Sequence, residues 1–219
     1  MPARTQSRTA ASTPISDTAA KVVGGASETS AVVGIVLAAG AGRRMGGPKA
    51  LIGPLATEGR TPLARVCGWL HDAGCPQVIA VIGAEADRVR SALQPTPWLT
   101  LVEAHDWNEG MGASLRTGLA AARRTEASAA LVTLVDLPDV RSRIYAHVLA
   151  GCGASPDTLC RAAYSGRPGH PVVIGRRWWD AAEASAVGDQ GARELFANHP
   201  HTLVECGHLG TGEDADTPV

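Results

Sequence analysis

Four short apolar segments, each followed by a helical pattern, constrain the fold of this chain. The apolar segments are rich in Val, Ile, Leu and Ala and lie at residues 32–40, 77–83, 99–104 and 129–138. The helical patterns occupy residues 61–74, 85–93, 112–126 and 143–152. Apolar, β-branched strands that alternate with helices predict a largely parallel α/β sheet covered by helices on both faces. Such sheets bind their ligands at the carboxyl ends of the strands.

The composition predicts one globular domain, residues 31–219, behind a polar tail. The chain has 219 residues and is 45% hydrophobic, which suffices for a sizeable core. Residues 1–30 are rich in Ser, Thr and Ala and are expected to be a disordered tail. Early arginines also occur in organelle transit peptides, but we favour an extension of a cytoplasmic protein.

Charge, hydropathy and cysteine spacing exclude several classes of protein. A net charge of −1 argues against a nucleic-acid-binding surface. No apolar run has the length needed to span a membrane, so no membrane contact is expected. The five cysteines are scattered and form no CxxC pair, which predicts reduced thiols, with neither a disulfide framework nor a zinc site.

A glycine-rich basic segment, LAAGAGRRMGGPKAL, follows the first strand at residues 37–51. Its glycines and cations predict a site for a phosphate chain. The dinucleotide fingerprint G-x-G-x-x-G fails because Met45 stands at the third glycine position, and a Walker loop fails because Ala50 follows Lys49. A nucleotidyltransferase loop remains, in which backbone amides wrap a nucleoside triphosphate. Lys49 and Lys21 are the two lysines of an arginine-biased chain, which favours a specific role for Lys49 as a compact point charge.

Six motifs together resemble those of the MobA-like nucleotidyltransferases, and within them the molybdenum cofactor cytidylyltransferases. In order they are GIVLAAGAGRRMGGPKAL, NEGMGASLRTGL, LVTLVDLPDV, GRPGHPVVIG, GDQGAREL and DADTP, and they span residues 34–219. The resemblance implies a Rossmann-like three-layer fold with a mixed, mainly parallel sheet. It also implies a reaction in which a nucleoside triphosphate and the phosphate of molybdopterin give a pyrophosphate-linked product and free pyrophosphate.

The resemblance assigns the triphosphate to the first loop and the base and ribose to the NEGMGASL segment. The implied nucleotide-binding residues are Leu37, Ala38, Ala39, Gly40, Gly42, Lys49, Gly110, Gly112 and Ser114. Arg44 is expected to hold the β- and γ-phosphates and Lys49 the α-phosphate, as catalytic residues with Asp136. Asp136 and Asp216 are the expected Mg²⁺ ligands, since magnesium prefers carboxylate and phosphate oxygens. Asp139 is expected to cap the following helix.

The acceptor is assigned to the later motifs by the same resemblance. The expected acceptor-binding residues are His170, Arg167, Asp189 and Arg193. Trp178 and Trp179 are interpreted as packing residues rather than as a stacking platform for a pterin. The pattern leaves open whether Arg116 faces the phosphates or solvent.

The letters LAAG predict CTP as the nucleotide, because guanylyl-transferring relatives typically have LAGG there. The methyl group of Ala39 is expected to narrow the turn against a larger purine. Two alternatives stay open. One is a MobA-like transferase that uses GTP or another triphosphate with a different phosphate acceptor. The other is a non-catalytic nucleotide-binding partner of a molybdoenzyme. A molybdoenzyme or its chaperone is also a candidate partner of the enzyme.

Overall fold

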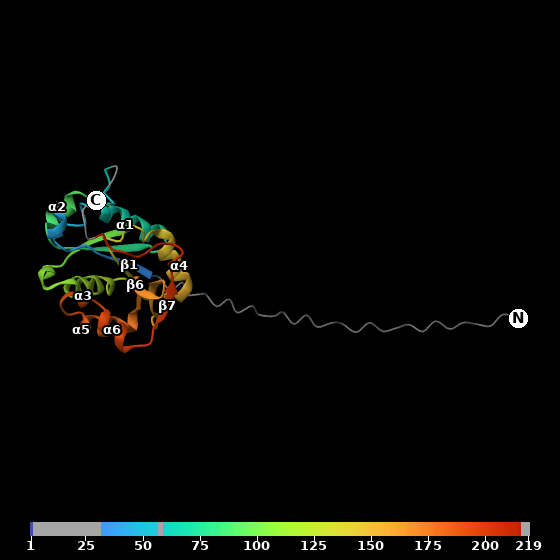
Figure 1. The fold of residues 1–219 in the computed structure, drawn as a ribbon. Helices are drawn as coiled ribbons and strands as arrows, with labels where there is room; N and C mark the ends of the chain where they lie inside the picture. The colour runs from blue at the N-terminus through green and yellow to red at the C-terminus, as the bar shows by residue number, and fades with distance from the viewer. Residues whose placement is uncertain (2–31, 57–58, 216–219) are drawn as a thin grey trace.

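The computed structural model describes Met1 and residues 32–56 and 59–215, and it has the expected α/β architecture (Figure 1). The predicted tail, residues 1–30, lies almost entirely outside the described residues, as does Asp216. Among the described residues no helix is both long enough and apolar enough to cross a membrane. All five cysteines are free thiols, as the sequence predicts.

A mixed, mainly parallel sheet of seven strands forms the centre of the described chain. The order across the sheet is β3-β2-β1-β4-β6-β5-β7. Strands β3, β2, β1 and β4 are parallel to one another, β6 runs antiparallel to β4 and β5, and β7 is parallel to β5. The strands are β1 (Val32–Leu37), β2 (Gln77–Ile82), β3 (Leu99–Glu103), β4 (Ala129–Leu134), β5 (Leu159–Tyr164), β6 (Arg167–Gly175) and β7 (Thr202–Glu205).

Helices cover both faces of the sheet, which confirms the three-layer prediction (Figure 1). Helices α1, α2 and α4 contribute to one buried apolar cluster, and α3, α5 and α6 contribute to the other. Strand β1 serves both clusters, since Val36 faces the first and Ile35 the second. The helices are α1 (Pro62–Asp72), α2 (Ala86–Ser91), α3 (Met111–Ala122), α4 (Ser142–Cys152), α5 (Trp179–Ser185) and α6 (Arg193–Asn198).

The four predicted strands and four predicted helices are all present, but β1 and β4 end three and four residues earlier than the apolar pattern does. Strand β1 ends at Leu37 and β4 at Leu134. Residues 135–141 therefore form a loop, and residues 38–48 form a loop that contains the short helix η1 (Arg43–Met45). Leu37 pairs with Leu134 in the parallel register, so both loops leave the sheet side by side. The early ends therefore place the glycine-rich loop next to the Asp136 turn.

Candidate active site

A cavity of about 630 Å³ opens at the carboxyl ends of β1 and β4. All of the predicted nucleotide-binding residues line it except Gly112, and so do Arg44, Asp136 and Asp189. The walls are the first loop, the beginning of α3, the turn after β4 and the short helix η4 (Gly188–Gln190). The lining residues are Leu37–Met45, Lys49, Trp107, Asn108, Gly110, Met111, Ser114, Leu134, Val135, Asp136 and Asp189.

The first loop is held in a tight turn that requires glycine at position 42. Gly42 has φ +56°, and its carbonyl accepts hydrogen bonds from the N–H groups of Met45 (2.8 Å) and Gly47 (3.3 Å). A Cβ on Gly42 would lie 1.9 Å from the carbonyl oxygen of Gly47, so no other residue fits this turn. Within the described residues, no backbone carbonyl accepts from the N–H groups of Gly40 and Ala41. Those amides can therefore donate to phosphate oxygens in the cavity.

Lys49 and Asp136 meet directly at one edge of this cavity. The Nζ atom of Lys49 donates to Oδ2 of Asp136 at 2.8 Å. Only 21% of the lysine side chain and 17% of the aspartate side chain are exposed, so water weakens this ion pair less than it would a surface pair. The two residues come from loops 87 positions apart in the chain. The sequence predicts that both lie at this edge, but it does not predict their contact.

Asp136 suits a magnesium ion that shares its coordination with phosphates. Among residues 32–56 and 59–215, no cluster of three His, Cys, Asp or Glu side chains could hold a metal ion by itself. Magnesium in nucleotide sites usually takes only one or two carboxylates and completes its shell with phosphate oxygens and water. The donor set therefore fits Mg²⁺ bound together with a triphosphate.

The C-terminal segment passes beside Asp136. The N–H of Ala215 donates to the carbonyl oxygen of Asp136 at 2.9 Å. Asp216 follows directly in the sequence but is outside the described residues, so its role as a second metal ligand stays a prediction. The prediction that Asp139 caps the next helix is wrong: α4 begins after Arg141 with no side-chain cap. Asp139 instead accepts hydrogen bonds from the backbone N–H and hydroxyl of Thr211, which fixes the C-terminal segment against the turn.

The beginning of α3 closes the cavity on the side opposite the Asp136 turn. Gly110, with φ +118°, lies so close to η4 that a Cβ there would be 2.5 Å from Oδ1 of Asp189. Gly112 faces away from the cavity, since its Cβ would lie 2.4 Å from the carbonyl oxygen of Ala186. Arg116 donates to that same carbonyl at 2.6 Å and to the Glu109 carboxylate at 2.7 Å. Gly112 and Arg116 therefore fix α3 against the end of α5.

Asn108, the first residue of the NEGMGASL segment, also lines the cavity, and so does Trp107, which the sequence analysis did not predict. Trp107 lies in the short helix η2 (Trp107–Glu109), directly before the matched NEGMG letters, which was the available signal. A Cβ on Gly83 would lie 2.7 Å from Cβ of Trp107 and 2.8 Å from Cβ of Ala39. The Ala39 methyl group is therefore packed near Gly83 and the tryptophan. It can influence a bound base through the position of Trp107.

A second cavity of about 140 Å³ adjoins the first and shares Leu37, Met111 and Asp189 with it. Among the predicted acceptor residues, His170, Asp189 and Arg193 line this cavity. Arg167 does not line it and is exposed at the beginning of β6. Burial lowers the pKa of His170 to about 4, helped by the nearby Arg161 and opposed by Asp136. His170 is therefore a neutral imidazole at pH 7.

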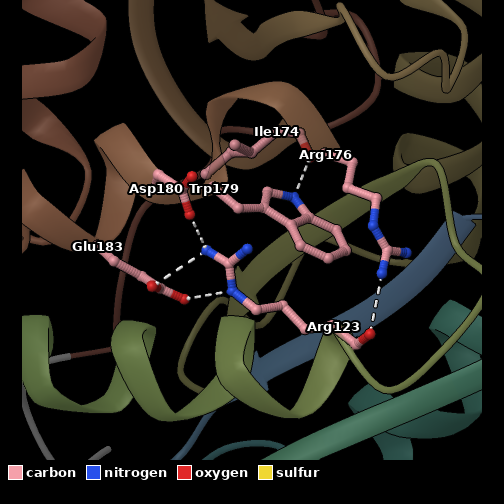
Figure 2. A network of polar contacts seen from close by, with 6 residues as sticks. All are labelled: Arg123, Ile174, Arg176, Trp179, Asp180 and Glu183. Carbon is pink, nitrogen blue, oxygen red and sulfur yellow. Dashed lines mark hydrogen bonds and ion pairs between the residues drawn. The ribbon is translucent and has the colours of Figure 1, made fainter.

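Both tryptophans pack against the scaffold, as the sequence predicts, and Figure 2 shows the surroundings of Trp179. Trp179 is fully buried, and its indole N–H donates to the carbonyl oxygen of Ile174 at 2.8 Å. The Arg176 guanidinium lies over its ring and donates to the Arg123 carbonyl oxygen at 2.9 Å, beyond the end of α3. Figure 2 shows Arg123 itself bound to Asp180 and Glu183, so α3, β6 and α5 form one rigid support. Trp178 donates to the carbonyl oxygen of Asp157.

Several known proteins resemble this chain in sequence and in structure. Residues 34–203 match the family model of the MobA-like NTP transferase domain. Nicotine blue oxidoreductase of Paenarthrobacter nicotinovorans is 37% identical over 196 residues, which cover 85% of this chain and 92% of that protein. The crystal structure of Rv0371c from Mycobacterium tuberculosis H37Rv is 28% identical, with a TM-score of 0.67 over 86% of this chain and 94% of that one. The structure of a Rv0371c complex with manganese is 28% identical, with a TM-score of 0.59 over 80% and 86% of the two chains.

Proposed function

The chain belongs to the MobA-like NTP transferase domain family, and from this premise we propose that it transfers CMP from CTP to the phosphate of molybdopterin cofactor. Pyrophosphate is the second product. The observation that carries the proposal is the Lys49–Asp136 pair at the edge of a 630 Å³ cavity walled by the glycine-rich loop. A cation, a carboxylate and backbone amides around one cavity are the groups that a magnesium triphosphate requires.

In the proposed reaction a phosphate oxygen of the acceptor attacks the α-phosphorus of CTP in line. One P–O bond forms as the bond from the α-phosphorus to the bridging oxygen of pyrophosphate breaks. The chain contributes positioning and charge, because phosphoryl chemistry needs little covalent help from a protein. Backbone amides of the loop and Arg44 would hold the β- and γ-phosphates, and Lys49 would face the α-phosphate, where charge develops. Mg²⁺ on Asp136 would neutralise phosphate charge.

The Lys49–Asp136 contact implies that both side chains exchange partners when the substrate binds. In the structure the ammonium group of Lys49 neutralises the carboxylate of Asp136 at 2.8 Å. When a magnesium triphosphate enters, the carboxylate can take the metal and the ammonium can take a phosphate oxygen. Each charge keeps a partner of opposite sign throughout, so neither is left buried and unpaired.

The choice of CTP over GTP rests on the letters LAAG, in which Ala39 stands where guanylyl-transferring relatives typically have glycine, and the Ala39 methyl group packs near Gly83 and Trp107. A single methyl group supplies discrimination of only about 1–3 kcal/mol. Contacts of the base edge with the Asn108 and Ser114 region must provide the remainder. We therefore expect Ala39→Gly to weaken the preference for CTP without reversing it.

An oxidoreductase is the second candidate, favoured by the relative whose name states an oxidoreduction and which is 37% identical to this chain. The same cavity could hold a nucleotide cofactor, although the loop lacks the dinucleotide fingerprint G-x-G-x-x-G. The two candidates differ in their product, since only the transferase releases pyrophosphate.

One experiment separates these functions. The protein is incubated with Mg²⁺, Mo-molybdopterin and each of the four triphosphates, and the products are identified by mass spectrometry together with a pyrophosphate assay. A parallel arm offers reduced nicotinamide and flavin cofactors with nicotine blue. We expect a cytidylylated cofactor and pyrophosphate, both absent in Asp136→Asn. A guanosine-linked product would exclude the choice of CTP, and dye reduction without any pyrophosphate release would exclude the transferase.

A further inference from the structure

Arg161 on β5 has no role in the nucleotide cavity, yet its side chain lines the second cavity. Its Nε atom is buried without a hydrogen-bond partner among the described residues. One Nη atom reaches the carbonyl oxygen of Gly169 only at 3.5 Å, and the guanidinium lies 5.1 Å from the ring centre of Phe196. A buried guanidinium nitrogen normally donates to an acceptor, so the Nε atom of Arg161 can still donate a hydrogen bond to a ligand.

Arg193 brings a second positive charge to the same small cavity. Burial lowers the pKa of Arg161 from its ordinary value, and repulsion from Arg193 lowers it further. No carboxylate lies within ion-pair distance of either arginine in the described part of the chain. The one carboxylate in the lining, Asp189, lies against Gly110 at the beginning of α3. An entering anion would relieve this repulsion.

We propose that Arg161 and Arg193 together bind the phosphate monoester group of the acceptor. This inference rests on the proposed nucleotidyl transfer, and it names the residues that present the attacking phosphate. Two guanidinium groups match the two negative charges of a phosphate monoester, and their planar forks suit its oxygens. Neutral His170 on the same wall adds a hydrogen-bonding ring nitrogen without a third positive charge.

The size and position of the cavity fit a phosphate group rather than a whole cofactor. Its volume of about 140 Å³ is well below the roughly 300 Å³ at which pockets for drug-sized ligands begin. It shares Leu37, Met111 and Asp189 with the nucleotide cavity, so a phosphate held here adjoins the triphosphate. The two arginines would also screen the repulsion between the acceptor phosphate and the triphosphate. The remainder of the acceptor would lie outside this cavity.

The test measures anion binding with the nucleotide cavity already filled. Protein saturated with Mg²⁺ and α,β-methylene-CTP, which cannot release pyrophosphate, is titrated with inorganic phosphate, glycerol 3-phosphate or pyrophosphate by calorimetry. We expect the first two to bind, and Arg161→Met and Arg193→Met to weaken each about 10- to 100-fold, the usual effect of losing one charged hydrogen-bonding group. Arg177→Met removes an exposed arginine that pairs with Asp157 and serves as the matched control with unchanged affinity. Preferential binding of pyrophosphate would assign the site to the leaving group and overturn the proposal.

The outcomes separate this inference from the proposed function. Unchanged phosphate affinity in Arg161→Met, with the CTP analogue still bound, would overturn the inference alone. If the analogue does not bind, the titration is run without it; phosphate binding that still depends on Arg161 would then refute only the nucleotidyl transfer. Should Arg161→Met fail to fold, Arg161→Lys keeps the charge but loses the planar fork, and unchanged affinity in that variant overturns the inference. In turnover assays we expect Arg161→Lys to raise KM for the acceptor while KM for CTP stays unchanged.

Discussion

Replacing Lys49 by methionine should strengthen metal binding in the absence of nucleotide, although it weakens catalysis. The ammonium group sits 2.8 Å from the Asp136 carboxylate and competes with any cation for it. Two unit charges at this distance attract by about 6 kcal/mol at an effective dielectric constant of about 20. Desolvation and residual hydration, with 21% and 17% of the side chains exposed, offset most of this attraction. A net competition of about 1–2 kcal/mol remains, so the dissociation constant for the metal should fall about 5- to 30-fold.

Manganese is the convenient probe, because its electron paramagnetic resonance signal reports the free ion directly. Wild type and Lys49→Met are titrated with Mn²⁺ without nucleotide, and kcat and KM are then measured with CTP. We expect tighter Mn²⁺ binding together with a kcat that falls more than the affinity for CTP does. Arg177→Met removes an equal charge from a side chain that is 73% exposed and should leave both quantities unchanged. Unchanged or weaker Mn²⁺ binding in a folded Lys49→Met protein would refute the proposed exchange at Asp136.

Three further perturbations test the site independently. Asp136→Asn should nearly abolish turnover with little change in Tm, because an amide holds Mg²⁺ poorly; wild-type rates would remove Asp136 from the reaction. Gly42→Ala should weaken CTP binding about 5- to 150-fold, measured by calorimetry, since its Cβ would lie 1.9 Å from the carbonyl oxygen of Gly47 at φ +56° and strain of about 1–3 kcal/mol must be relieved by moving the loop. His170 has a folded-state pKa of about 4 against an ordinary value of 6.5, so the unfolded chain takes up the proton first as pH falls. Between pH 6.5 and 4 this should cost up to about 3 kcal/mol of unfolding free energy, and chemical denaturation of His170→Gln should show a smaller loss.

The sequence predicts the nucleotide half of the molecule well because that half is built from local patterns. The apolar run before the loop predicts β1, and the glycines predict a backbone that turns sharply at Gly42. Parallel strands bring their carboxyl ends to one edge, so the loop after β1 and the Asp136 turn after β4 must be neighbours. These inferences need no knowledge of side-chain conformation. Most of the predicted nucleotide-binding residues accordingly line the larger cavity, although Gly112 does not and Trp107 was not predicted.

The contacts that cross the fold could not be predicted in the same way. The hydrogen bonds from Thr211 to Asp139 join residues 72 positions apart, and no local pattern distinguishes them from a helix cap. Trp107 lines the cavity because Gly83, which directly follows β2, leaves room for it. Arg161 is one of many arginines in the sequence, and only the register of β5 against β6 shows that it reaches the second cavity. Tertiary packing supplies this information, and the sequence of each segment alone does not contain it.

The two cavities are built from different kinds of groups, and this difference bears on how the reaction could vary within the family. The nucleotide cavity is bounded in part by backbone, namely the turn at Gly42 and the ends of two parallel strands. We expect substitutions in that turn, such as Gly42→Ala, to damage binding. The second cavity lies on the antiparallel part of the sheet and is lined by exchangeable side chains, with Arg161 and Arg193 supplying its charge. Replacing one arginine removes affinity for an anionic acceptor but leaves the turn at Gly42 intact. The chemistry of the acceptor can therefore change while the nucleotide cavity persists. Relatives whose names state other reactions should accordingly differ from this chain in the charged residues of the second cavity.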